Sequence, residues 1–145
     1  MDISIGRTGV QGTRKATFGF TKLIVDDEEA MAEYYHQVYG LNKLHRVAGK
    51  ESAAGGPFRE IIMGPGETMG AESLTMFKFL DRQAPSQQET ILGFTTEDLD
   101  ALAERVRANG GKLVDKIWDM PEHGVRVLFT TDPEGRLSEN VQILK

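Results

Sequence analysis

Three histidines and 22 acidic residues are the side chains in this chain that a metal ion would be expected to use, and they can also transfer protons. His36, His45 and His123 include no two at the spacing of a metal-binding pair. Cysteine is absent, which excludes a thiol nucleophile, a disulfide scaffold, a zinc ribbon and an iron–sulfur site. The turn at 64–66 is not followed by a helix that carries Lys and Ser or Thr, so it is not a phosphate-binding loop. The sequence therefore favours no metal, thiol or phosphate chemistry.

Length and charge narrow the function classes further. The chain has 145 residues, of which 39% are hydrophobic, and this is enough for one core without disulfides. Its 17 basic and 22 acidic residues give a net charge of -5, which disfavours nucleic acid as a partner. No apolar run approaches the length of a membrane span, and the first residues lack the apolar segment of a signal peptide. We therefore expect a cytoplasmic domain with no membrane partner.

The elements that position the chemistry begin with a strand and a helix. Alternating and largely apolar residues predict a buried strand over 18–25. Asp26 is predicted to cap the helix that follows, with Glu29 completing a capping box, and Gly40 is predicted to end it. The apolar stripe of this helix consists of Met31, Tyr35 and Val38.

The same order of elements then occurs twice. A position in the first strand–helix unit plus 71 gives its counterpart in the second, so that Ala30 matches Ala101 and Gly40 matches Gly111. We therefore predict an α+β fold of two strand–helix–three-strand modules, at about 17–80 and 89–145, behind a flexible N-terminal arm at 1–16. The remaining strands are predicted at 44–47, 58–63, 74–80, 90–95, 112–118, 125–130 and 137–144, and a second helix is predicted to begin after Thr96-Glu97-Asp98.

Two stretches carry a resemblance to a known family. The tail at 132–142, which begins Asp-Pro-Glu-Gly, and the strand at 20–27 with its helix both resemble the vicinal oxygen chelate superfamily. This superfamily includes glyoxalase I, bleomycin resistance proteins and extradiol dioxygenases. The resemblance covers residues 18–144. It implies two βαβββ modules that form one cup-shaped, mostly antiparallel sheet around a central cavity, and it implies a homodimer.

The resemblance also indicates where metal ligands would lie. The first-strand His position falls on Phe20, the fourth-strand Glu position on Ser73 and the fifth-strand His position on Ile91; only the eighth-strand Glu is kept, as Glu139. If the match to the family pattern is shifted by one residue in this strand, Glu72 takes the fourth-strand position in place of Ser73. A transition metal needs at least three protein ligands. We therefore expect no metal and no cofactor, which argues against glyoxalase I and extradiol chemistry.

Nine residues are predicted to line the cup. Lys22 shares a strand face with Phe20, so it could pair with Glu139 as a substrate-gripping or acid–base pair. The alternatives are a structural ion pair, or a remnant carboxylate at Glu139 that accepts from backbone donors. Ser73, Thr75 and Phe77 also share one face. For these three the alternative is ordinary sheet packing. The predicted ligand-binding residues are Phe20, Lys22, Ser73, Thr75, Phe77, Ile91, Trp118, His123 and Glu139.

Trp118 and His123 flank the loop that the resemblance places at the rim of the cup. Their alternatives are core packing and a solvated turn. Taken together, the sequence predicts a metal-independent protein that binds a small organic ligand. A second class stays open: a lyase, isomerase or dioxygenase of the same superfamily, either metal-free with Glu139 and Lys22 as its catalytic candidates or with metal ligands that lie elsewhere.

Overall fold

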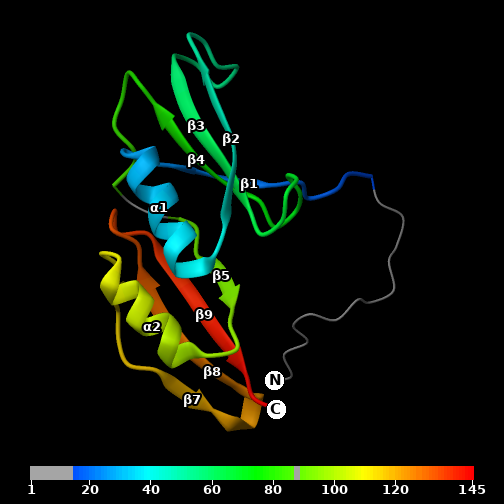
Figure 1. Cartoon of the computed structure of the whole chain (residues 1–145), viewed down its shortest axis with the longest axis vertical. Coiled ribbons are helices and arrows are strands. Elements are labelled where there is room, and N and C mark those ends of the chain that lie inside the picture. Colours follow the sequence, from blue (N-terminus) through cyan, green and yellow to red (C-terminus); the bar gives the residue numbers. More distant parts are fainter. Residues whose placement is uncertain (1–14, 87–88) are drawn as a thin grey trace.

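The structure is a computed structural model that describes residues 15–86 and 89–145 (Figure 1). Residues 1–14 of the predicted flexible arm lie outside the described part. The first module contains β1 (Thr21–Ile24), α1 (Glu28–Tyr39), β2 (Asn42–Gly49), β3 (Phe58–Gly64) and β4 (Leu74–Phe79). The second contains β5 (Leu92–Thr95), α2 (Leu99–Ala108), β6 (Lys112–Leu113), β7 (Trp118–Met120), the short 3-10 helix η1 (Pro121–His123), β8 (Val125–Thr131) and β9 (Leu137–Ile143).

The predicted α+β class and the two modules are confirmed, but the strands form two sheets and not one. The first sheet has the order β1-β4-β3-β2, and the second has the order β5-β9-β8-β6, with β7 also paired to β8. The first strand of each module runs parallel to the last, and the other neighbours are antiparallel. Because β1 and β5 are edge strands of different sheets, no hydrogen-bonded ladder of the described residues closes a single cup within one chain.

The starts of the two helices repeat each other closely. Asp27 and Asp98, which are 71 positions apart, are both extended N-cap residues, and their carboxylates accept the N–H of Ala30 and Ala101 at 3.0 Å. The prediction that Asp26 caps α1 is wrong. Its carboxylate accepts the backbone N–H of Ala84 at 2.6 Å, so it cannot serve the first turn of the helix.

The predicted strand over 112–118 is interrupted. Leu113 pairs with Thr130 and Trp118 pairs with Val127, so five steps along this segment match only three steps along β8. The two extra residues must leave the ladder, because paired strands advance at the same rate. The segment therefore forms two short strands, β6 and β7, with an irregular connection at 114–117.

Each helix covers one face of its own sheet, and the two helices contact each other where the modules meet (Figure 1). The main core cluster draws on both modules, because Leu102 and Val106 of α2 pack with Tyr35 and Val38 of α1. Arg105 adds a hydrogen bond from Nε to the carbonyl oxygen of Val38 at 2.9 Å. The helix side of both sheets is therefore filled.

The turn at 132–136 also joins the second module to the first. The Glu134 carboxylate accepts the backbone N–H groups of Asp26 and Asp27 at 2.9–3.2 Å, just before α1. Arg136 donates to Glu134 at 2.9 Å and to the carbonyl oxygen of Ile24. The turn at the start of the 132–142 stretch, which carries part of the family resemblance, is thus a contact between the modules.

No helix among the described residues is both long and apolar enough to cross a membrane.

Candidate functional site

The face of the first sheet that points away from α1 gathers most of the predicted ligand-binding residues. Leu23, Ile61 and Met76 belong to the core under α1, so the residues that alternate with them point to the opposite face. We call this opposite face the aromatic face; it consists of Phe20, Lys22, Phe58, Glu60, Thr75, Phe77 and Phe79.

An ion pair lies across this face. Lys22 is on β1 and Glu60 is on β3, with β4 between them, and the Lys22 Nζ lies 2.8 Å from Glu60 Oε2. Lys22 pairs directly with Thr75 of β4, and Glu60 pairs directly with Phe77. The stem of Lys22 must therefore pass over β4 to reach Glu60. The Lys22 side chain is 39% exposed and that of Glu60 only 8%, so solvent meets the ammonium group first.

The hydroxyl of Thr75 lies on the same face and has no partner. Thr75 is 0% exposed, and its Oγ1 is the only buried side-chain N or O atom without a hydrogen bond in the described part of the chain. A buried polar atom without a partner costs about 1–3 kcal/mol. Such atoms are rare in folded proteins, and each one calls for an explanation.

Aromatic rings surround the ion pair. Phe58 and Phe77 stack with their ring centroids 5.2 Å apart, and Phe79 meets Phe77 edge-on at 4.8 Å. The Lys22 Nζ lies 5.1 Å from the centre of the Phe77 ring and 5.7 Å from that of Phe20. Cations favour the faces of aromatic rings at these distances. The aromatic face therefore combines one compensated ion pair, one free hydroxyl and several rings.

The second sheet has a comparable uncovered face, with different chemistry. Glu139 of β9 lies beside Gly93 of β5 and Phe129 of β8, and it lines a pocket of about 330 Å³ made only of residues of its own module. Ile91 is 55% exposed beside this sheet. Trp118 is 52% exposed and pairs with Val127 at the far side of the sheet. Beside Glu139 this face carries the hydroxyl of Thr95, which pairs with Val141, and the apolar side chains of Val127, Phe129 and Val141.

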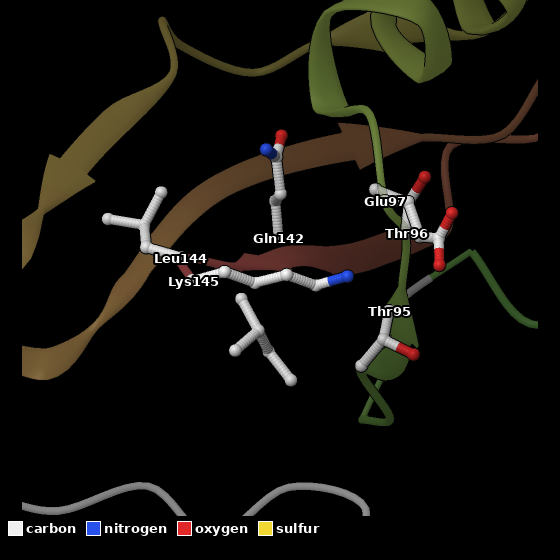
Figure 2. Close-up of a pocket in the computed structure, with 7 residues that line it drawn as sticks. Thr95, Thr96, Glu97, Gln142, Leu144 and Lys145 are labelled. Carbon is white, nitrogen blue, oxygen red and sulfur yellow. The ribbon is translucent and has the colours of Figure 1, made fainter.

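A broader pocket of about 610 Å³ opens where β5 ends beside the chain end (Figure 2). Figure 2 shows the Lys145 side chain extended toward Thr96 and Glu97, whereas Gln142 points away from it. The Gln142 Oε1 already accepts the backbone N–H of Leu99 at 2.9 Å. This pocket was not predicted, and its central polar group is already bonded.

The predicted residues thus divide between two sheets. Phe20, Lys22, Thr75 and Phe77 meet on the aromatic face, whereas Ile91, Trp118 and Glu139 lie on the second sheet. The pair predicted between Lys22 and Glu139 is not formed within the chain, because Lys22 bonds to Glu60.

Ser73 and His123 take other places. The Ser73 Oγ accepts the N–H of Gly70 at 2.7 Å, so this hydroxyl holds a loop. His123 lies in the short helix η1, where its Nε2 is 4.0 Å from the Glu122 carboxylate.

Glu60 is the residue that sequence reasoning missed. It shares one face of β3 with Phe58 and Ile62, so that one carboxylate interrupts an apolar strand face. A charged residue at such a position is almost never fully buried unless it is paired. This rule could have indicated from the sequence that Glu60 has a partner, but it could not identify Lys22 as that partner.

Comparison with known proteins extends over nearly the whole chain. Residues 17–139 match the family model described as Glyoxalase/Bleomycin resistance protein/Dioxygenase superfamily. A glyoxalase family protein from Bacillus cereus shares 18% identity at a TM-score of 0.75, covering 94% of this chain and all of that one. Trypanothione-dependent glyoxalase I from Leishmania major shares 16% identity at a TM-score of 0.67, covering 88% and 87%.

Glyoxalase I from Zea mays shares 16% identity at a TM-score of 0.65 over 87% of this chain, which spans 44% of the length of the maize enzyme. At these identities the likeness concerns the fold alone. No curated protein matches the chain.

The residues present do not fit the metal that this fold holds in some proteins. Phe20 and Ile91 have hydrocarbon side chains, the Ser73 hydroxyl is bonded to Gly70, and Glu139 alone offers a carboxylate. Among residues 15–86 and 89–145 no three His, Cys, Asp or Glu side chains lie close enough together to hold a metal ion. The shift of one residue that would use Glu72 still leaves fewer than three ligands.

Proposed function

Because this chain belongs to the Glyoxalase/Bleomycin resistance protein/Dioxygenase superfamily, we propose that it binds a small organic molecule on the aromatic face without a metal or other cofactor. The observation that carries this proposal is the buried, unpartnered hydroxyl of Thr75 under the Lys22–Glu60 ion pair. A sheet that served packing alone would gain stability from Val at this position, since Val has the same shape without the unpaired oxygen. A ligand oxygen would supply the missing partner.

The surroundings of Thr75 support binding over a purely structural role. Small-molecule sites combine apolar and aromatic walls with a few polar groups that orient the ligand. Here the walls are Phe20, Phe58 and Phe77, and the polar groups are Thr75 and the ammonium group of Lys22. The partial exposure of Lys22 leaves a route by which a ligand can enter.

We further propose that two copies of the chain associate as a homodimer. Each copy has two uncovered sheet faces, and both carry exposed apolar side chains: Phe20 and Ile24 on one, Ile91 and Ile143 on the other. A two-fold axis would place the first sheet of each copy against the second sheet of the other, so that the same contact forms twice. This arrangement would close the aromatic face of each copy against water.

Two measurements test these proposals. Isotope-labelled protein is titrated with a mixture of small aromatic compounds, and chemical shifts are followed by NMR. The proposal expects the largest shifts at Thr75, Phe77 and their neighbours, with the compounds recovered unchanged. Shifts confined to other regions would overturn binding at this face, and consumption of a compound would support the enzymatic alternative. For the dimer, sedimentation analysis should give twice the 16.1 kDa of one chain at micromolar concentration.

A further inference from the structure

We infer that the aromatic face selects an uncharged, flat ring compound that carries a carbonyl or hydroxyl oxygen, in preference to an organic anion or cation. This inference rests on the proposed function and names the class of ligand. It follows from how the charges, the hydrogen-bonding groups and the rings are arranged on this face.

The charge on the face is already balanced. Lys22 and Glu60 form a pair at 2.8 Å, so their charges cancel at the distance of a ligand. At the Phe79 end of the face, Arg82 lies over the Phe79 ring and is bonded to Asp81 at 2.9 Å, so these two charges are also paired. An anion drawn to the ammonium group would meet the Glu60 carboxylate, and a cation drawn to Glu60 would meet the ammonium group. A buried charge without a compensating partner is costly, so ions are disfavoured on this face.

The hydrogen-bonding groups match a neutral oxygen. The Lys22 ammonium has three N–H groups, and its one hydrogen bond to the described residues goes to Glu60. The Thr75 hydroxyl lies at the directly paired position of the next strand, about 4.8 Å away between backbones. A carbonyl oxygen has two lone pairs and can accept from both groups, and a ligand hydroxyl can accept from one and donate to the other.

Lys22 must move for a ligand to reach Thr75. Its stem starts at the position paired with Thr75 and crosses β4 to reach Glu60, and Thr75 below this crossing is 0% exposed. The stem is a flexible four-carbon chain, and the side chain is 39% exposed. It can therefore lift while its ammonium group stays close to Glu60.

The rings require a flat ligand. Phe20 is 44% exposed and Phe58 is partly exposed on the other side of the ion pair, whereas Phe77 between them is nearly buried. A planar ring can lie over this surface with its oxygen directed toward Lys22. Stacked and edge-on arrangements of such rings are favourable beyond the area that they bury.

Three compounds that share one 4-hydroxyphenyl ring test the charge preference. The neutral compound is 4-hydroxyacetophenone, the anion is 4-hydroxybenzoate and the cation is tyramine. Each is titrated into labelled wild-type protein, and dissociation constants are taken from the NMR shifts on the aromatic face. We expect the ketone to bind at least tenfold more tightly than either ion.

Variants assign that preference to the named residues. Thr75→Val should weaken binding of the ketone three- to tenfold, whereas the matched control Thr68→Val, in the exposed loop between β3 and β4, should leave it unchanged. Glu60→Gln should reverse the preference toward 4-hydroxybenzoate, and Lys22→Met should reverse it toward tyramine. Glu60→Gln is the decisive variant. It leaves Lys22 unpaired, but Lys22 is partly exposed and water can still solvate its charge, whereas Lys22→Met leaves the nearly buried Glu60 carboxylate unpaired.

The outcomes separate the two proposals. Binding of either ion on this face as tightly as the ketone would overturn the inference about ligand class and leave the proposed function intact. Absence of shifts on the aromatic face with all three compounds, and with the aromatic mixture, would overturn both. An equal effect of Thr75→Val and Thr68→Val would contradict the role of the Thr75 hydroxyl.

Discussion

The Tyr35 hydroxyl of α1 donates a hydrogen bond of 2.9 Å to Oδ2 of Asp132, a residue 97 positions later in the other module. Both residues are buried, and Arg136 flanks the same carboxylate at 3.7 Å. The turn that carries the family resemblance is therefore held to the first helix by a side-chain bond in the interior. Removing this bond by mutation therefore measures how much it contributes to the stability of the two packed modules.

Replacing Tyr35 with Phe should lower the free energy of unfolding by about 1–3 kcal/mol, because the buried Asp132 carboxylate then loses a donor. Urea unfolding measures the change. The matched control is Tyr34→Phe in the same helix, because the Tyr34 hydroxyl makes no hydrogen bond with the described residues. Equal losses in the two variants would contradict a specific role for the bond.

Stability should fall at alkaline pH because of the tyrosines. Burial raises the pKa of Tyr34, Tyr35 and Tyr39, and the Asp132 charge raises the pKa of Tyr35 further. A group whose pKa is higher in the folded state stabilises the fold below its unfolded pKa, near 10, and this contribution is lost as pH rises above that value. Each such tyrosine should reduce the unfolding free energy by about 1.4 kcal/mol per pH unit there.

The chain has three tyrosines and one tryptophan. Because the indole of Trp118 does not ionise in this range, the rise in absorbance at 295 nm with pH reports on the tyrosines. We expect phenolate absorbance to appear together with the loss of helical circular dichroism. Ionisation near pH 10 in a chain that is still folded would contradict the burial effect. Tyr35→Phe should have a shallower loss of stability between pH 10 and 11 than the wild type.

Replacing Thr75 with Val should leave the protein as stable or make it more stable, by up to about 1 kcal/mol, because an unpartnered buried oxygen is removed. Thr130→Val is the comparison. Thr130 is also 0% exposed, but its hydroxyl accepts the Nδ2–H of Asn140 at 2.9 Å, so this variant should lose about 1–2 kcal/mol. Chemical denaturation of both variants without ligand measures these changes in unfolding free energy. A large loss of stability in Thr75→Val would mean that the Thr75 hydroxyl has a hydrogen-bond partner.

The N-cap of α1 can be tested by comparing two neighbouring aspartates. Asp27→Ala should cost about 1 kcal/mol, as should Asp98→Ala in the second module, since each removes the acceptor for a free N–H of the first turn. Asp26→Ala removes only an exposed bond to the loop at Ala84. If Asp26→Ala proved more costly than Asp27→Ala, the helix would begin one residue earlier than described.

Metal content tests the proposal that no metal takes part. Protein purified without chelators should contain well under one equivalent of nickel, zinc or iron, because two of the four ligand positions are Phe20 and Ile91. Glu139→Gln should not change this content. One equivalent in the wild type that disappears in Glu139→Gln would restore the metalloenzyme alternative.

Local features of the fold were predictable from the sequence because they depend on neighbours along the chain. The left-handed residue that ends α1 at Gly40, with φ of 74°, follows from a glycine after an apolar stripe. Alternation placed Thr75 and Phe77 on one face, and the offset of 71 matched the caps Asp27 and Asp98 even though the first cap was assigned to Asp26.

Only the tertiary structure decided which strands lie side by side. Lys22 meets Glu60 because β1 pairs with β4 and β4 with β3, two pairings between segments up to about 50 residues apart. A repeat in the sequence shows that two modules exist, but it does not say whether their edge strands join in one sheet; here β1 and β5 remain edges of two. That the Thr75 hydroxyl lacks a partner was also decided only by the tertiary structure. Whether a hydroxyl is satisfied depends on every atom packed around it, and most of those atoms come from other strands.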